Sequence, residues 1–217
     1  MSGRPFAVTR LDDLERLEGE LVTLPVRLRF GIESFGVNAY EAGESGRVIE
    51  EHDELGAGAG RHEELYLVAR GHALFTLDGK DVDAPEGTFV FVSDPAVRRG
   101  AVAAPDAPGT VVLVVGGVPG KPFSPSPWEA WLEAAPHLKA GEPERGVEVL
   151  ERALAAHPGN PNLLYNLACF ESLAGMTDSA LAHLSEAIAA EPRAHTWAES
   201  DSDFDPIRVD PRFPKSS

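Results

Sequence analysis

The sequence contains a single cysteine, Cys169, among its 217 residues. One thiol excludes an internal disulfide and suits a reducing compartment. No apolar run approaches the roughly 18–20 residues that span a bilayer, and the first residues lack the apolar stretch of a signal peptide. We therefore expect a cytoplasmic protein with no membrane partner.

Basic residues are also scarce. The chain carries 19 Lys and Arg against 35 Asp and Glu, which gives a formal net charge of −16. Such a surface repels a phosphate backbone, so we expect no nucleic-acid partner. Hydrophobic residues still make up 43% of the chain. That is enough to bury a core, while the excess of acidic residues favours solubility.

The beginning of the chain predicts a short helix. Thr9 and Asp12 have the spacing of an N-terminal capping pair. Leucines then recur at the spacing of one helical face. We expect a helix over residues 9–18, within an N-terminal segment at residues 1–23. The leucines are Leu11, Leu14, Leu17 and Leu21.

From residue 24 to residue 118 the sequence changes to short apolar or alternating runs separated by turn residues. Asp78 and Gly79, for example, predict a tight hairpin turn. About eight short strands at this spacing predict an antiparallel sandwich or barrel of the jelly-roll type. A stiff proline-rich linker follows at residues 119–127.

Residues 128–208 repeat with a period of 34. Recurring small residues, with a proline closing each unit, resemble the tetratricopeptide repeat family, in which short side chains let paired helices cross closely. Gly146 stands where that family usually has alanine, and the acidic, aromatic ending resembles the cap of a terminal repeat. Residues 209–217 are expected to form a tail. The pairs that carry the period are Ala153 and Ala187, Leu150 and Leu184, Pro158 and Pro192, and Gly146 and Ala180.

The stretch that begins at Gly87 resembles a motif of the cupin family. In that motif a glycine, five mostly apolar residues, a proline, a glycine and a metal-binding histidine follow in order. Here the five residues are 88–92, and Arg98 falls in the slot of the histidine. The resemblance implies a multidomain chain, β then α. It would contain a cupin-type double-stranded β-helix or jelly-roll barrel at residues 24–118, followed by a short array of tetratricopeptide-like α-helical hairpins.

The other cupin motif is matched at its end, where Glu64 takes the place of the family's glutamate. The two histidines that precede this glutamate in the family are missing at the normal spacing, where Ala57 and Ala59 stand. If the glycine-rich loop between residues 55 and 60 is an insertion, His52 and Glu54 can reach those two places.

Three interpretations of this pocket are open. A histidine and two glutamates, with a second histidine on the same strand face, could hold zinc, iron or manganese. Alternatively Arg98, which is permanently cationic, grips a carboxylate or phosphate without any metal, or the polar groups only satisfy one another. Because Arg98 puts a positive charge in the fourth ligand slot, we favour a metal-free pocket with no cofactor. Its candidate ligand-binding residues are Arg98, Glu64, Tyr66, His52, Glu54 and His62.

The favoured function is that of a non-catalytic binding or adaptor protein. The barrel would recognise a small molecule, such as an anion, or mediate homodimerisation, while the helical repeats would bind a protein partner. The alternative is a cupin enzyme of the oxygenase, isomerase or lyase type, either metal-dependent or metal-free. We assign no catalytic residue from the sequence.

Overall fold

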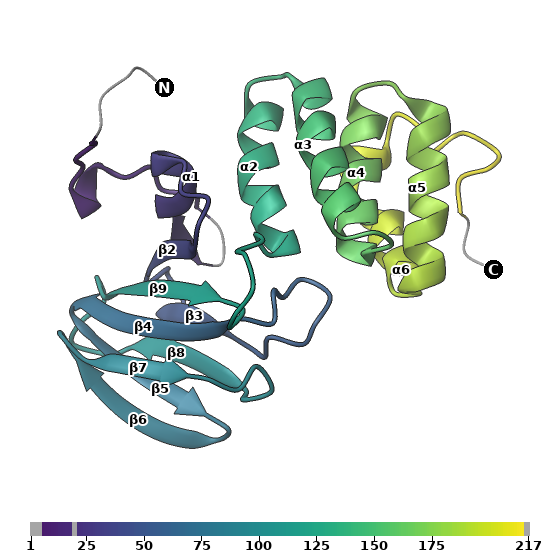
Figure 1. The fold of residues 1–217 in the computed structure, drawn as a ribbon. Helices are drawn as coiled ribbons and strands as arrows, with labels where there is room; N and C mark the ends of the chain where they lie inside the picture. The colour runs from purple at the N-terminus through teal and green to yellow at the C-terminus, as the bar shows by residue number, and fades with distance from the viewer. Residues whose placement is uncertain (1–5, 19–20, 215–217) are drawn as a thin grey trace. The chain divides into compact units, whose positions relative to one another are not determined.

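The computed structural model describes residues 6–18 and 21–214, and it divides into two compact units, Met1–Ser124 and Pro125–Ser217 (Figure 1). The first unit consists mainly of strands and the second consists of helices. No helix in the described part of the chain is both long enough and apolar enough to cross a membrane.

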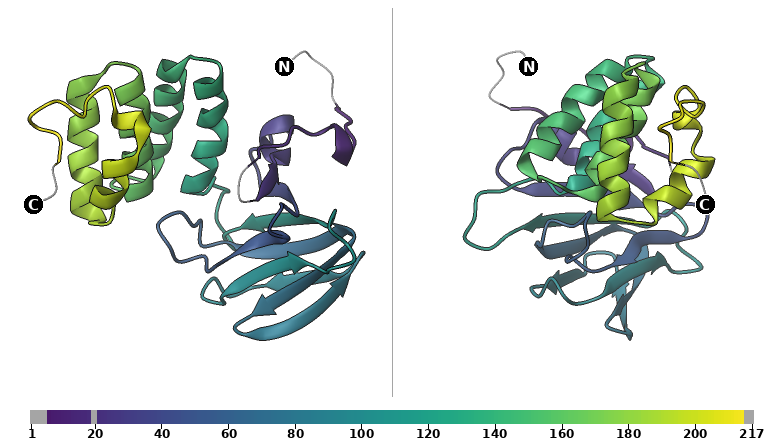
Figure 2. Two further views of the ribbon diagram at one scale, coloured as in Figure 1. Left: turned by 180° about the vertical axis from the view of Figure 1, so that it is seen from behind. Right: turned by 90° about the vertical axis from the view of Figure 1, so that its right-hand side faces the viewer.

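The β unit is a sandwich of two antiparallel sheets, which lie as two layers in Figures 1 and 2. One sheet has five strands in the order β1-β2-β9-β4-β7, and the other has four in the order β3-β8-β5-β6. Apart from the adjacent pairs β1-β2 and β5-β6, strands that follow one another in the chain lie in different sheets, as in a jelly roll. The strands are β1 (Val22–Leu24), β2 (Gly36–Glu41), β3 (Arg47–His52), β4 (Glu63–Arg70), β5 (His72–Leu77), β6 (Lys80–Pro85), β7 (Phe89–Val92), β8 (Arg99–Ala103) and β9 (Val111–Gly117).

Alternation along the strands builds the core of this unit. On β4, Tyr66 and Val68 face inward and are 1% exposed, and they pack in one cluster with Phe75 of β5 and Ala101 of β8. The Tyr66 and Phe75 rings meet edge to face at 5.5 Å. Side chains from the two sheets therefore interdigitate, as expected for a sandwich.

The predicted hairpin turn is present between β5 and β6. Asp78 and Gly79 both have positive φ, 49° and 75°, and the flanking pair is Leu77 opposite Lys80. A two-residue turn with left-handed backbone at both positions matches the twist of the strands it joins. Glycine at the second position adopts this conformation without a steric penalty.

The helix predicted over residues 9–18 is wrong. That stretch contains only one 3-10 turn, η1 (Leu11–Asp13), and a short helix, α1 (Val26–Phe30), comes after β1 instead. Asp12 does not cap a helix but accepts a hydrogen bond from Arg70 at 2.8 Å. Leu14 is buried against the outer face of the five-stranded sheet, where it packs with Leu24 of β1, and Leu11 is partly buried beside it. Tertiary packing thus replaces the helix that their spacing predicted.

The helical unit consists of two antiparallel helix pairs followed by a capping segment. The 34-residue period relates α2 to α4 and α3 to α5, and three of these helices begin with proline, which suits the first helical turn. Asn160 caps α4 by accepting hydrogen bonds from the amides of Asn162 and Leu163, both at 3.1 Å. The helices are α2 (Pro127–Lys139), α3 (Pro143–Ala156), α4 (Pro161–Leu173), α5 (Thr177–Ala190), α6 (Ala194–Ser200) and the 3-10 turn η2 (Ser202–Phe204).

The C-terminal segment closes this unit and extends further than expected. Phe213, predicted to lie in a tail, is 6% exposed and belongs to the helical core. Arg208 donates to the carbonyls of Ala198, Glu199 and Asp201 at 2.6–3.0 Å and so satisfies the end of α6. The packed unit therefore continues past residue 208.

Candidate functional site

A polar cluster lies where the two sheets of the β unit meet. Glu64 and Tyr66 come from β4 in the five-stranded sheet. His52, at the end of β3, is paired in register with Arg99, the first residue of β8, in the other sheet. Glu54 follows β3 in the connecting loop. Residues far apart in the sequence are therefore brought together by the jelly-roll topology.

Glu64 is the centre of this cluster. Its Oε2 atom accepts a hydrogen bond from the Tyr66 hydroxyl at 2.5 Å and lies 3.3 Å from Nε of Arg99 and 3.8 Å from Nε2 of His52. Its side chain is 12% exposed. A carboxylate so deeply placed needs such partners, because an unpaired buried charge is very costly.

Glu54 is held by the glycine-rich loop. Its Oε2 atom accepts the backbone N–H groups of Gly60 at 2.9 Å and His62 at 3.1 Å, while its Oε1 atom lies 3.8 Å from Nε2 of His52. The residue is only 4% exposed. The loop thus folds over the carboxylate and turns it toward His52.

The expected inward orientation of Arg98 is wrong. Arg98 points to solvent, with 59% of its side chain exposed, and pairs with Glu51. Its neighbour Arg99 is the buried guanidinium, with a side chain 0% exposed. The reason is strand parity: Ala101 faces the core, so Arg99, two residues earlier, shares that face and Arg98 does not.

His62 contacts the cluster through its backbone and not through its ring. The side chain is buried, and its ring lies 5.7 Å from the ring of Phe123. The groups whose ligand atoms lie within 4.8 Å of one another are His52, Glu54 and Glu64, without His62. His62 therefore supports the loop, and Arg99 is the member of the cluster that counting along the motif missed.

The charges of the cluster depend on one another. Burial lowers the pKa of His52, but the Glu64 carboxylate and the Glu50 carbonyl raise it by more, so that it ends above its usual value. The imidazole Nδ1 donates to that carbonyl at 2.7 Å. Burial raises the pKa of Glu64, yet His52, Tyr66 and Arg99 together lower it below its usual value. Burial and Glu64 raise the pKa of Tyr66, which stays a hydroxyl donor.

The side chains of this cluster can be compared with the ligands that a divalent cation prefers. One imidazole and two carboxylates with ligand atoms within 4.8 Å of one another are a plausible set for zinc, iron or manganese. However, Nε of Arg99 lies 3.3 Å from the same Glu64 oxygen. A divalent ion about 4 Å from that guanidinium would be repelled by about 8 kcal/mol at an effective dielectric constant of about 20. The residues therefore fit a self-neutralised cluster better than a resident cation.

A second group of potential ligands lies in the helical unit, around Cys169. Its Sγ atom lies 3.7 Å from Oδ2 of Asp201, which also accepts the Tyr165 hydroxyl at 2.9 Å, and Asp203 is nearby. Burial, and then the two aspartates, raise the pKa of the Cys169 thiol. The thiol is therefore protonated at neutral pH and serves as a packing residue.

We predict that Cys169 resists alkylation in the folded protein. At pH 8, iodoacetamide should modify it about 100-fold more slowly than the same thiol in urea, because the thiolate is suppressed and access is blocked. Mass spectrometry of timed samples measures both rates. Equal rates in the folded and unfolded chain would contradict this.

Comparison with family models identifies the helical part of the chain. Residues 137–198 match the family model of the tetratricopeptide repeat. The predicted order, a jelly-roll sandwich followed by repeat helices, is confirmed at the level of fold. Comparison with curated proteins gives no match.

Several solved structures resemble part of the chain. A cupin protein from Bacteroides fragilis is 16% identical over 57% of this chain and 92% of its own, with a TM-score of 0.42. KdgF from Halomonas sp. is 17% identical over 51% and 93%, with a TM-score of 0.40. An RmlC-like cupin from Shewanella frigidimarina is 17% identical over 52% and 91%, with a TM-score of 0.39.

Proposed function

We propose that this protein is a non-catalytic binding or adaptor protein. Its β unit binds a small anion, and its helical repeats bind a protein partner. The observation that supports anion binding by the β unit is the burial of Arg99 with a hydrogen-bond donor left unpaired in the described part of the chain. This side chain is fully buried, and its Nη2 atom has no hydrogen-bond partner among the described residues.

Arg99 is oriented for such a role. Its Nη1 atom donates to the carbonyls of Val97 at 2.8 Å and Pro95 at 3.2 Å, which fixes the plane of the guanidinium. Buried donors are nearly always satisfied, so a free one favours an incoming acceptor. A carboxylate or phosphate oxygen suits it, since charge-assisted bonds to arginine are among the strongest hydrogen bonds in proteins.

The side of the cluster that faces solvent supports access for a ligand. The side chain of His52 is 34% exposed, whereas Glu54 and Glu64 beside it are nearly buried. With its raised pKa, His52 adds positive charge below neutral pH. An anion would meet His52 first and reach Arg99, whose side chain is 0% exposed, after the side chains between them move, while the Tyr66 hydroxyl would stay bound to Glu64.

Isothermal titration of the full chain with inorganic phosphate, acetate and succinate tests this proposal. We expect at least one of these anions to bind saturably to wild type and to Arg98→Ala. Its affinity should fall about tenfold or more in Arg99→Met, since a charge-assisted hydrogen bond contributes about 1.5–3 kcal/mol. Equal affinity in Arg99→Met, or no binding of any of the three, would contradict an anion role.

A second candidate is a cupin enzyme, favoured by the proximity of His52, Glu54 and Glu64. Elemental analysis of the purified protein separates the two proposals. Near-stoichiometric zinc, iron or manganese that is lost in Glu64→Ala would replace anion binding with a cation-dependent role.

The remaining alternative, homodimerisation through the β unit, is supported by Phe89 and Phe91, which are exposed on the edge strand β7. Light scattering coupled to size-exclusion chromatography measures the molar mass in solution and so distinguishes a dimer from a monomer.

A further inference from the structure

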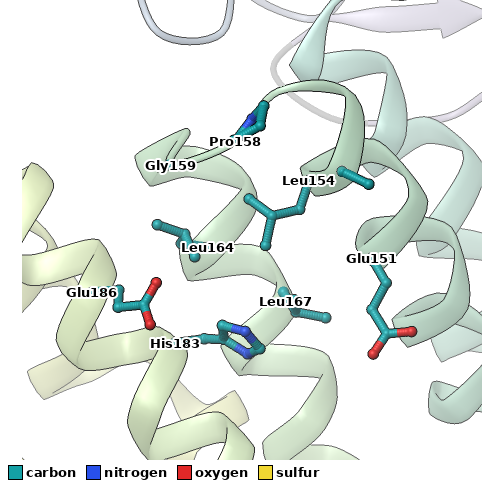
Figure 3. Close-up of a pocket in the computed structure, with 9 residues that line it drawn as sticks. Glu151, Leu154, Pro158, Gly159, Leu164, Leu167, His183 and Glu186 are labelled. Atoms are coloured by element: carbon teal, nitrogen blue, oxygen red, sulfur yellow. The ribbon is translucent and has the colours of Figure 1, made fainter.

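The helical unit contains an open groove of about 450 Å³. It runs between α3 and α5 and has α4 as its floor (Figure 3). Its volume is sufficient for a few side chains and lies within the range of specific binding pockets. The lining residues are Glu151, Leu154, Ala155, Pro158, Gly159, Leu164, Leu167, His183 and Glu186.

The floor of this groove is apolar. Leu164 and Leu167 of α4 are 3% and 0% exposed, and Leu154 of α3 is half-buried beside them. Figure 3 shows these three leucines between the two walls. An aliphatic side chain placed here would bury its own apolar surface and part of that of Leu154, which is favourable by about 25 cal/mol per Å².

The walls are acidic. Glu151 projects from α3 on one side and Glu186 from α5 on the other, as Figure 3 shows, and neither carboxylate forms an ion pair among the described residues. The nearby arginine of α3, Arg152, pairs with Glu133 instead, at 3.1 Å. Two unneutralised carboxylates thus flank an apolar floor.

A third carboxylate lies deeper. Glu171 is 1% exposed and accepts a hydrogen bond from Nδ1 of His183 at 2.8 Å. Burial raises the pKa of Glu171, the His183 contact lowers it by less, and Glu151 adds to the rise, which places the Glu151 charge close by. A third acidic side chain, hydrogen-bonded to His183, therefore lies beneath the acidic walls of the groove.

We propose that this groove binds a segment of a partner protein in which an aliphatic residue stands next to lysine or arginine. The aliphatic side chain packs on the three leucines while the cationic group lies between Glu151 and Glu186. A second copy of this chain is disfavoured because its net charge is also −16. The proposal rests on the proposed function in assigning the partner to the helical unit, and it adds the surface and the chemistry recognised there.

Selection of a random dodecapeptide phage library on the full chain, at about 0.15 M salt, tests the proposal. We expect selected peptides to share leucine, isoleucine or valine beside lysine or arginine. Fluorescence anisotropy then measures the affinity of one selected peptide for wild type, for Glu151→Gln/Glu186→Gln and for a control double variant. In Glu151→Gln/Glu186→Gln the affinity should fall about tenfold or more, because two charge contacts in a partly desolvated groove are lost.

An acidic protein attracts basic peptides non-specifically, so a matched control is needed. Glu44→Gln/Asp106→Asn removes the same two charges at exposed positions of the β unit and should bind the peptide like wild type. Equal losses in both double variants, or selected peptides without basic residues, would overturn the groove assignment. A peptide that binds all three proteins equally would contradict the groove while leaving the adaptor role intact, whereas failure to select any peptide would count against both.

Discussion

Replacing Arg99 with alanine is expected to lower the free energy of unfolding of the β unit by about 3–5 kcal/mol. The substitution leaves the Glu64 carboxylate, with a side chain only 12% exposed, without its permanent counter-charge. Hydrogen exchange measured by mass spectrometry on peptides from β4 and β8 reports this unit, since opening free energies are read strand by strand. The loss is a large part of the roughly 5–15 kcal/mol that stabilises a typical domain.

The adjacent residue supplies the matched control. Arg98 pairs with Glu51 at the surface, where solvent screens the pair, so Arg98→Ala should leave the free energy of unfolding nearly unchanged. The double variant Arg99→Met/Glu64→Gln should recover much of the loss, because exchanging a buried pair for uncharged groups is often nearly neutral. If Arg98→Ala and Arg99→Ala prove equally mild, Arg99 does not pair with Glu64 as described.

The contrast between these two arginines shows where sequence reasoning ends. The local signals were sufficient for Asp78 and Gly79, because a two-residue hairpin turn is determined by its own backbone preferences. The orientation of Arg98 and Arg99 is not determined by local preferences. Counting from Gly87 along a family motif placed Arg98 inside, and a one-residue error exchanges the two faces of a strand. Alternation backward from Ala101 would have placed Arg99 inside.

The helix predicted from the first leucines is wrong, and the groove is not predictable from the sequence, for a different reason. Leu11 and Leu14 have helical spacing, but the sheet offers a surface on which Leu14 is buried and Leu11 is partly buried without a helix. The groove combines Glu151 and Glu186, which belong to different repeats, over a floor from a third helix. No spacing within a single helix predicts such a site, because it exists only once the repeats are stacked.

A second large effect is expected where the 34-residue period is broken. Gly146 takes the place of an alanine, and a Cβ atom built on it would lie 2.1 Å from Cε1 and 2.2 Å from Cδ1 of Phe170. Phe170 is 0% exposed and meets Trp131 edge to face at 6.1 Å, so its ring has little room to move. The ring fills the space that the methyl group would need.

Gly146→Ala should therefore destabilise the helical unit by about 1–2 kcal/mol. Overpacking costs about 1–3 kcal/mol and sometimes more, while alanine regains about 1 kcal/mol of helix propensity, so the clash outweighs the gain. All three tryptophans, Trp128, Trp131 and Trp197, lie in this unit. Urea unfolding followed by tryptophan fluorescence therefore measures it with no tryptophan signal from the β unit.

A double-mutant cycle separates the clash from a general effect on α3. Phe170→Leu alone should cost stability by opening a cavity. In Gly146→Ala/Phe170→Leu the new methyl group fills part of that space, so the two losses should add to more than the double variant shows, by about 1 kcal/mol or more. Strict additivity would mean that the ring and the glycine do not compete for one volume. The only remaining explanation for glycine at position 146 would be backbone freedom. A residue inside a regular helix such as α3 does not need that freedom.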